Sequence, residues 1–101
     1  MLIFNTTYQV TTKHTENWMQ WIKTDHIPYM MKSELFLEPQ ISKIVGSEDE
    51  SGTSFSVQYK IDNMDSLILW HKQYATEFQG IVSAKFGTEV VFFSTVLEIL
   101  D

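Results

Sequence analysis

Hydrophobic and polar positions alternate along residues 2–11 and again along residues 54–61. A period of two predicts β-strands that bury one face. Two further stretches are extended in pattern: residues 39–45, which open on a proline, and residues 88–100, which are apolar on both faces. Residues 48–52 form a polar segment that ends in glycine, typical of a hairpin tip. The pattern therefore predicts four strands, with the second and third joined as a hairpin.

From about His14 the pattern changes to that of an amphipathic helix. Its apolar stripe contains Trp18, Ile22, His26 and Tyr29. Pro28 has no N–H to donate to the preceding turn, and its ring clashes with the carbonyl four residues earlier. We therefore predict that the helix kinks or ends near His26, with a break between Asp25 and Tyr29.

A second helical pattern follows Asp62 or Asn63, either of which can cap a helix. Its predicted inner stripe contains Met64, Leu67, Ile68, His71, Tyr74, Ala75, Phe78, Val82 and Phe86. Gly87 is placed to terminate this helix, because glycine readily adopts the left-handed conformation found just past a helix end.

The predicted elements follow the order βαββαβ. Two helices on one face of a four-stranded antiparallel sheet make a ferredoxin-like α+β sandwich with right-handed crossovers. The usual strand order of that arrangement, 4-1-3-2, places the last strand at an edge. A length of 101 residues allows one domain, so we assign residues 1–101 to a single ferredoxin-like domain.

Composition narrows the classes of function. The chain has 13 Asp and Glu against 7 Lys and Arg, a formal net charge of −6. This balance argues against binding to nucleic acid or to an anionic membrane surface, because both need clustered basic residues. Without cysteine the chain has no disulfide and no thiol nucleophile. No signal-peptide pattern occurs and no apolar run reaches the ~18 residues of a membrane span, so we expect a cytoplasmic protein.

The sequence contains no recognised metal or cofactor motif. His-x-x-x-His, Gly-x-Gly-x-x-Gly and Gly-x-Ser-x-Gly are all absent. The acidic residues 48–50 lack the alternating ligand spacing of a calcium loop. We therefore predict neither a metal nor a cofactor.

Four motifs together resemble one small bacterial family. They are Trp18-x-x-Trp21, His26-Ile27-Pro28-x-x-Met31, Val57-Gln58-Tyr59 and Phe92-Phe93-Ser94-Thr95-Val96-Leu97-Glu98-Ile99. The chain is similar, over nearly its whole length, to the domain of unknown function family 4286. The resemblance implies a dimeric α+β barrel and no established activity. Family members more often carry arginine at the position of Ser94, so no role of that arginine transfers to this chain.

A wider resemblance connects the chain to other dimeric α+β barrels: cofactor-free oxygenases, mutarotases, haem-degrading monooxygenases and lactone isomerases. Several of these place a histidine near the end of the first helix or on the second. A shared fold does not by itself assign an activity.

His26 is the candidate catalytic residue. It lies on the inner stripe of the first helix and directly before the Pro28 break, so we predict an imidazole that is at least half buried and hydrogen-bonded. Two roles remain open. His26 either binds a backbone carbonyl that the break leaves free, or acts as a general acid/base at the mouth of a pocket, since histidine titrates near neutral pH.

His71 lies centrally on the apolar stripe of the second helix, which predicts burial against the sheet. The resemblance to haem-degrading proteins, which use an asparagine on the first strand, a tryptophan and a histidine, implies a haem-binding alternative for Asn5 and His71. Trp70 does not complete that set, because adjacent helical positions point about 100° apart. We predict that His71 binds neither haem nor metal.

Small polar residues occupy one face of the first and third predicted strands: Asn5, Thr7, Gln9, Ser54, Ser56 and Gln58. On a lone sheet this face would be solvated, whereas in a dimeric barrel it would line a cavity between two sheets. Hydroxyls and amides there would orient a ligand, and aromatic residues would supply contact area. The candidate ligand-binding residues are Asn5, Thr7, Trp18, Ser56, Gln58 and His71.

The last strand carries large apolar residues on both faces. Val91, Phe93, Leu97 and Ile99 lie on one, and Val90, Phe92, Val96 and Leu100 lie on the other. Two helices can bury only one face of the sheet. Leaving the other exposed forgoes roughly 1.5–3 kcal/mol for each large side chain. We therefore predict a homodimer whose sheets pack face to face about a two-fold axis.

Three functions follow from this sequence: a homodimer that binds a small molecule between its sheets, a cofactor-independent oxygenase or isomerase that uses His26, or a purely structural or interaction dimer. No nucleic-acid or membrane partner is expected.

Overall fold

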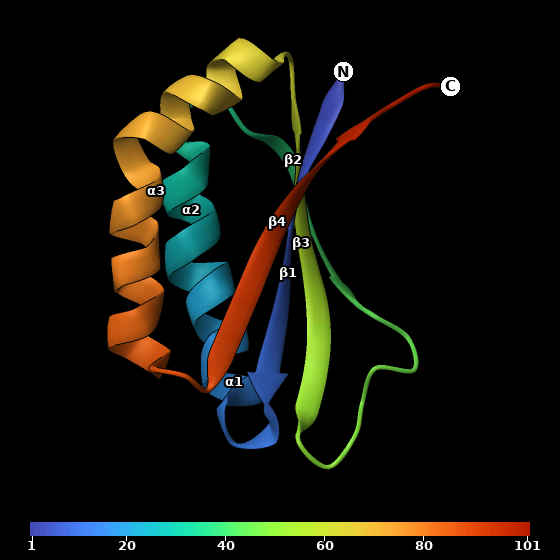
Figure 1. Cartoon of the computed structure of the whole chain (residues 1–101), viewed down its shortest axis with the longest axis vertical. Helices are drawn as coiled ribbons and strands as arrows, with labels where there is room; N and C mark the ends of the chain where they lie inside the picture. The colour runs from blue at the N-terminus through green and yellow to red at the C-terminus, as the bar shows by residue number, and fades with distance from the viewer.

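Helices cover one face of a four-stranded antiparallel sheet (Figure 1). The computed structural model describes all residues, 1–101. The strands are β1 (Leu2–Thr11), β2 (Leu37–Lys43), β3 (Gly52–Ile61) and β4 (Val90–Glu98). Their order in the sheet is β2-β3-β1-β4. The predicted strand order is confirmed, and β4 lies at an edge.

The helical layer has two parts. The first is a continuous helical run of α1 (Thr15–Trp21), a π-helical segment (Ile22–His26) and α2 (Ile27–Met31), preceded by a 3₁₀ turn at Thr12–His14. The second is α3 (Met64–Phe86), which spans 23 residues. None of these helices has the length and hydropathy needed to cross a membrane.

The register of β1 separates the two faces of the sheet. Phe4 lies opposite Tyr59 of β3 and Val96 of β4, and all three point toward the helices. The next residue, Asn5, lies opposite Gln58 and Thr95 on the uncovered face, which we call the open face. Because side chains alternate along a strand, this pairing assigns every residue of β1, β3 and β4 to one face.

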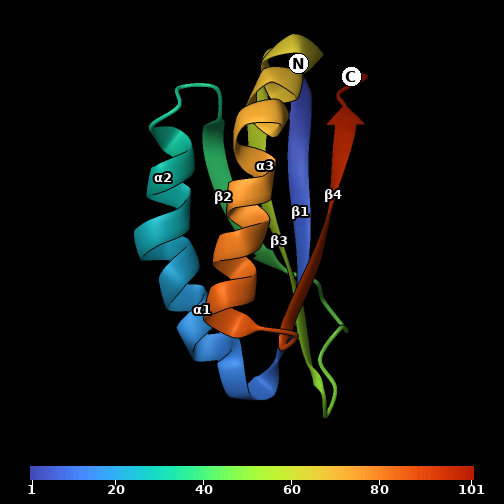
Figure 2. The same ribbon diagram turned by 60° about the vertical axis from the view of Figure 1, so that its left-hand side comes forward.

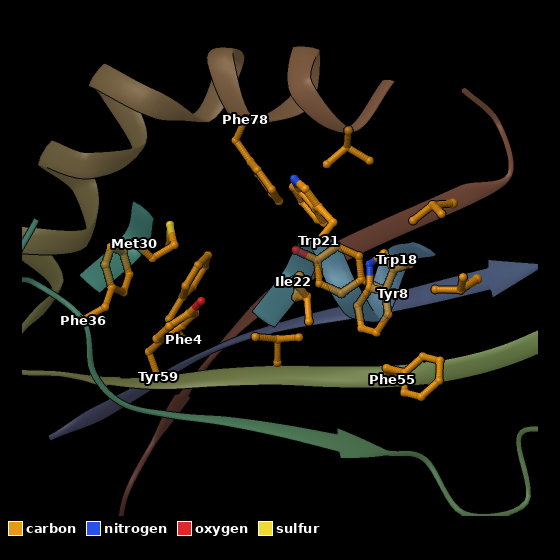
Figure 3. Packing of buried hydrophobic residues seen from close by; sticks show 14 of the residues in the cluster. Phe4, Tyr8, Trp18, Trp21, Ile22, Met30, Phe36, Phe55, Tyr59 and Phe78 are labelled. Carbon is orange, nitrogen blue, oxygen red and sulfur yellow. The ribbon is translucent and has the colours of Figure 1, made fainter. Parts of the chain in front are cut away.

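Aromatic side chains fill the space between the helices and the sheet (Figure 3). Trp18 of α1 stacks on Phe55 of β3, with ring centroids 4.8 Å apart. Farther along the sheet, Phe4 contacts Phe36 and Trp70 at 5.8 and 5.6 Å. Tilted and edge-on pairs of this kind add specific geometry to the burial of apolar area.

The first helix does not break at Pro28, which corrects our prediction. The Ile27 N–H donates to the carbonyl of Ile22, five residues earlier, so the helix widens into a π turn before the proline. Pro28 then lies in the first turn of α2, where its missing N–H costs little. His26, the last residue of the π-helical segment, is buried as predicted, at 6% exposure.

The ends of α3 are as predicted, and Leu67, Phe78, Val82 and Phe86 of the predicted stripe are buried, but three other members of the stripe are exposed. Asn63 caps the helix by accepting a hydrogen bond from the Ser66 N–H at 3.0 Å, and Gly87 follows its last residue with φ +59°. The predicted burial of His71 is wrong: Trp70 is buried instead, at 3% exposure, and His71 is exposed. The larger indole fills the space above Phe4 and Phe36, which turns the neighbouring imidazole to the side of the helix. Met64 and Ile68, also predicted to face inward, are exposed at 43% and 50%.

The hairpin between β2 and β3 has the predicted polar tip. The Asp49 side chain accepts hydrogen bonds from the hydroxyl and N–H of Ser51 and from the Gly52 N–H. These bonds lower the pKa of Asp49, with the Ser51 hydroxyl as the main cause. Ile44 and Val45, expected within the second strand, lie beyond its end and are exposed.

We predict that Tyr59→Phe stabilises the protein. The Tyr59 hydroxyl is buried without a hydrogen-bond partner, while its ring packs edge-on against Phe36 at 5.3 Å. Phenylalanine keeps the ring contacts and removes the unsatisfied group, which adds about 1 kcal/mol to the free energy of unfolding in urea. Tyr74→Phe, at a partly exposed position, is the control and changes stability by less than about 0.5 kcal/mol. A loss of stability in Tyr59→Phe would show that a bound water satisfies the hydroxyl.

Candidate functional site

The structure brings together four of the seven predicted site residues. Asn5, Thr7, Ser56 and Gln58 lie side by side on the open face, on the paired strands β1 and β3. Trp18 and His26 lie in the core on the other side of the sheet, and His71 lies on the surface of α3. The predicted residues therefore belong to three separate places.

Asn5 is the centre of a hydrogen-bonded group on the open face. Its Nδ2 donates to Thr7 Oγ1 at 3.1 Å and to Thr95 Oγ1 at 3.3 Å, and its Oδ1 accepts from the Ser56 hydroxyl. We call Asn5, Thr7, Ser56, Gln58 and Thr95 the Asn5 cluster. The sequence analysis does not single out Thr95, although its polar side chain interrupts an otherwise apolar strand. Gln58 is adjacent to Asn5 in the register, and its amide forms no side-chain hydrogen bond within the chain.

Apolar side chains flank the Asn5 cluster along β4. Val91, Phe93 and Leu97 share the open face and are exposed at 53%, 61% and 47%. The face is therefore polar at its centre and apolar along one edge. Monomeric proteins rarely leave a large exposed apolar patch without a partner.

Trp18 does not reach the Asn5 cluster. It is fully buried at 0% exposure between the rings of Tyr8 and Phe55, with the sheet separating it from the open face. Its contacts are those of a core residue, and nothing in its position provides the ligand contact predicted from the sequence.

His26 lies between two aromatic rings. Its imidazole stacks on Trp21 and Phe78, with centroid distances of 5.0 and 4.7 Å and interplanar angles of 15° in both cases. The predicted hydrogen bond is not formed. Burial lowers the pKa of His26 from 6.5 to about 4, because a charged imidazolium would lose its solvation.

A hollow of about 230 Å³ borders His26, with Asp25, Tyr29 and Lys85 at its rim. At pH 7 the imidazole is neutral and weakly basic, whereas an efficient general acid/base has a pKa near the working pH. The acid/base role of His26 stays a prediction, and its aromatic stacking gives it a structural role in the helical layer.

His71 lies at a different hollow, between α3 and β4. Its neighbours there include the aromatic rings of Phe4, Trp70 and Phe92. No group of three or more His, Cys, Asp or Glu side chains lies close enough together to hold a metal ion.

We predict that His26 makes stability depend on pH. The unfolded chain binds a proton at His26 near pH 6.5, whereas the folded protein resists protonation down to about pH 4. The neutral His26 therefore makes its full contribution to the free energy of unfolding above pH 6.5. This contribution, up to about 3 kcal/mol, is lost as the pH falls toward 4. Urea unfolding between pH 7.5 and 4 measures this loss. His26→Phe keeps a ring between Trp21 and Phe78 and removes the pH-dependent loss of stability that is due to His26. The effect of carboxylate titration cancels when the variant curve is subtracted from the wild-type curve.

The matched control is His71→Phe, which removes an exposed histidine. Its stability follows the pH curve of the wild type. Parallel curves for the wild type and His26→Phe would contradict burial of a neutral His26.

Solved structures with the same fold come from several organisms. A candidate antibiotic biosynthesis monooxygenase from Deinococcus radiodurans has a TM-score of 0.68 and 18% identity, and the match covers 100% of this chain and 94% of that one. An ethyl tert-butyl ether d (EthD) family protein from Bacillus halodurans has a TM-score of 0.70 and 17% identity, and the match covers 99% of this chain and 100% of that one. A dimeric ferredoxin-like protein from an uncultured marine organism has a TM-score of 0.70 and 10% identity, with coverages of 99% and 95%. At these identities the matches establish a shared fold, which confirms the ferredoxin-like architecture.

No functionally curated protein matches the sequence. The family comparison is positive over nearly the whole chain: the domain of unknown function family DUF4286 matches residues 1–100. This confirms the resemblance seen in the sequence motifs, and the chain belongs to the DUF4286 family.

Proposed function

We propose that the protein is a homodimer whose two sheets pack through their open faces and enclose a small molecule. The observation that carries this proposal is the composition of the open face. Its centre is the hydrogen-bonded Asn5 cluster, and its edge is the exposed apolar row of Val91, Phe93 and Leu97.

The large exposed area of one protomer favours pairing with a second copy. The protomer exposes 6486 Å², whereas a compact monomer of 11.8 kDa is expected to expose about 5,900 Å². The excess of roughly 600 Å² is close to the ~800 Å² that each partner buries in a standard interface. Pairing through the apolar row would cover the side chains responsible for part of this excess.

The Asn5 cluster can be buried at low cost. Asn5 already uses both amide protons and its carbonyl oxygen within the protomer, so dehydration leaves none of these groups unpaired. Gln58 differs, because its amide has no partner in the chain and its carbonyl and NH₂ remain free. In a closed dimer these groups would provide the specific hydrogen bonds to a bound molecule.

The similar structures agree with this proposal in two respects. One is described as dimeric, and another is named for the biosynthesis of antibiotics, which are small molecules. Their identities of 10% and 18% transfer no activity to this chain. The feature of this protein that favours a dimer with a bound molecule is the composition of its open face.

We predict a dimer in solution that Phe93→Glu dissociates. Light scattering at micromolar concentration is expected to give twice the chain mass of 11.8 kDa for the wild type and the single mass for the variant. A carboxylate among the apolar side chains of β4 would be buried in the interface without a partner. Val45→Glu introduces the same charge at a loop position that is 92% exposed, and it leaves the dimer intact. A monomeric wild type would overturn the barrel and its cavity.

We predict that the bound molecule is recognised through Gln58. In a thermal-shift screen of small molecules, a compound that binds the folded dimer raises the melting temperature. Gln58→Leu is expected to lower the affinity for such a compound about tenfold, the effect of one or two lost hydrogen bonds. Gln73→Leu, at an exposed position on α3, leaves binding unchanged.

The two other functions give different results. A dimer with no ligand in the screen, whatever the compound class, would favour a purely structural or interaction role. A ligand that is converted, with the conversion abolished in His26→Phe, would favour the cofactor-independent oxygenase or isomerase.

A further inference from the structure

A second concavity lies on the other side of the sheet from the Asn5 cluster, between α3 and β4. It has a volume of about 350 Å³, within the ~300–1,000 Å³ range of small-molecule sites. We call it the α3–β4 pocket. It belongs to one protomer and does not depend on the cavity between the sheets.

The pocket exists because α3 does not cover β4. The helix lies in front of β3, and β1 and then β4 stand to one side of it (Figure 2). The helix-facing side chains of β4 are therefore incompletely covered: Phe92 is half-buried and Val96 is 40% exposed. Small residues on the adjoining face of α3, such as Ala75, leave room between helix and strand.

Aromatic rings form the floor and sides of the pocket. Phe4 and Trp70 lie at one end, with ring centroids 5.6 Å apart, and Phe78 and Phe92 lie at the other, 5.1 Å apart. Neither pair is parallel, since their planes are inclined by 62° and 50°. Surfaces of this kind favour a flat aromatic guest, which gains contact through offset or edge-to-face packing.

The polar groups of the pocket are uncharged alcohols and amides together with one imidazole. They belong to Thr76, Gln79, Ser94 and His71, and no Lys, Arg, Asp or Glu lines the pocket. Ser94 shares a 3.0 Å hydrogen bond with Thr6, which is buried behind it, so Ser94 presents its remaining hydrogen-bonding capacity to the pocket. A charged guest would lose its solvation here without gaining an ionic partner.

We propose that the α3–β4 pocket binds a flat, uncharged aromatic molecule that carries a hydroxyl or carbonyl group. The rings of Phe4, Trp70, Phe78 and Phe92 hold the aromatic part. Ser94 and His71 bind the polar group, Ser94 from the strand and His71 from the helix. This site is separate from the proposed intersheet site.

The test uses 1-naphthol as the probe in an NMR titration of the ¹⁵N-labelled full chain. Binding is expected to be saturable at one molecule per protomer, with the largest shift changes at the Trp70 indole, His71 and Ser94. The analogue 1-naphthalenesulfonate has the same rings and a negative charge. The sulfonate is expected to bind at least about tenfold more weakly, because no Lys or Arg lines the pocket.

Two variants of α3 separate binding in the pocket from binding elsewhere. Ala75→Phe places a ring inside the pocket and is expected to weaken 1-naphthol at least tenfold. The matched control, Ala84→Phe, adds the same ring at an exposed position of the same helix and leaves the affinity unchanged. If Ala75→Phe does not fold, Thr76→Phe blocks the pocket from an exposed lining position.

Three results would overturn the proposal. They are the absence of saturable binding, equal affinity for the sulfonate, and shift changes confined to Asn5, Gln58 and Leu97 on the open face. Gln58→Leu distinguishes the two sites, because it lowers the affinity for a ligand between the sheets and leaves the affinity for 1-naphthol in the α3–β4 pocket unchanged.

Discussion

The two-residue alternation of β1, which is paired on both sides, is the constraint on which the rest of the molecule depends. One set of its side chains, including Phe4 and Tyr8, enters the aromatic core, and the intervening set, including Asn5 and Thr7, forms the open face. A slip of one residue in register would exchange the two sets and place Asn5 in the core. The strand therefore determines at once what holds the helices and what surface is offered to a partner.

The aromatic core in turn determines where the helical side chains point. Trp70 occupies the space above Phe4 and Phe36, so its neighbour His71 faces the side of α3 and reaches the α3–β4 pocket. His26 is held between Trp21 and Phe78, where desolvation keeps its imidazole neutral. The two histidines that the sequence singles out thus differ in environment: His26 is buried between aromatic rings, and His71 is exposed at the pocket.

The fold is shared with proteins of different description, so the function of this chain has to be argued from its own surfaces. Those surfaces are chemically similar in one respect. Neither the Asn5 cluster nor the lining of the α3–β4 pocket contains Lys, Arg, Asp or Glu, although the chain carries a formal net charge of −6. Lys60, which shares the open face with Gln58, is paired with Glu38 of the edge strand β2 at 3.1 Å. Both candidate sites are therefore suited to uncharged guests.

The sequence by itself determined the features that depend on local periodicity and on single residues with strong conformational preferences. The order of strands and helices, the Asn63 cap, the end of α3 at Gly87 and the polar face around Asn5 all follow from such patterns. Only the tertiary structure decided how the helices are rotated and what they touch. It placed His71 outside the core, enclosed Trp18 on the far side of the sheet from Asn5, and carried the first helix past Pro28 through a π turn. The rotation of a helix and the widening of one turn depend on the volumes of side chains contributed by distant strands, and a local pattern carries no information about those volumes.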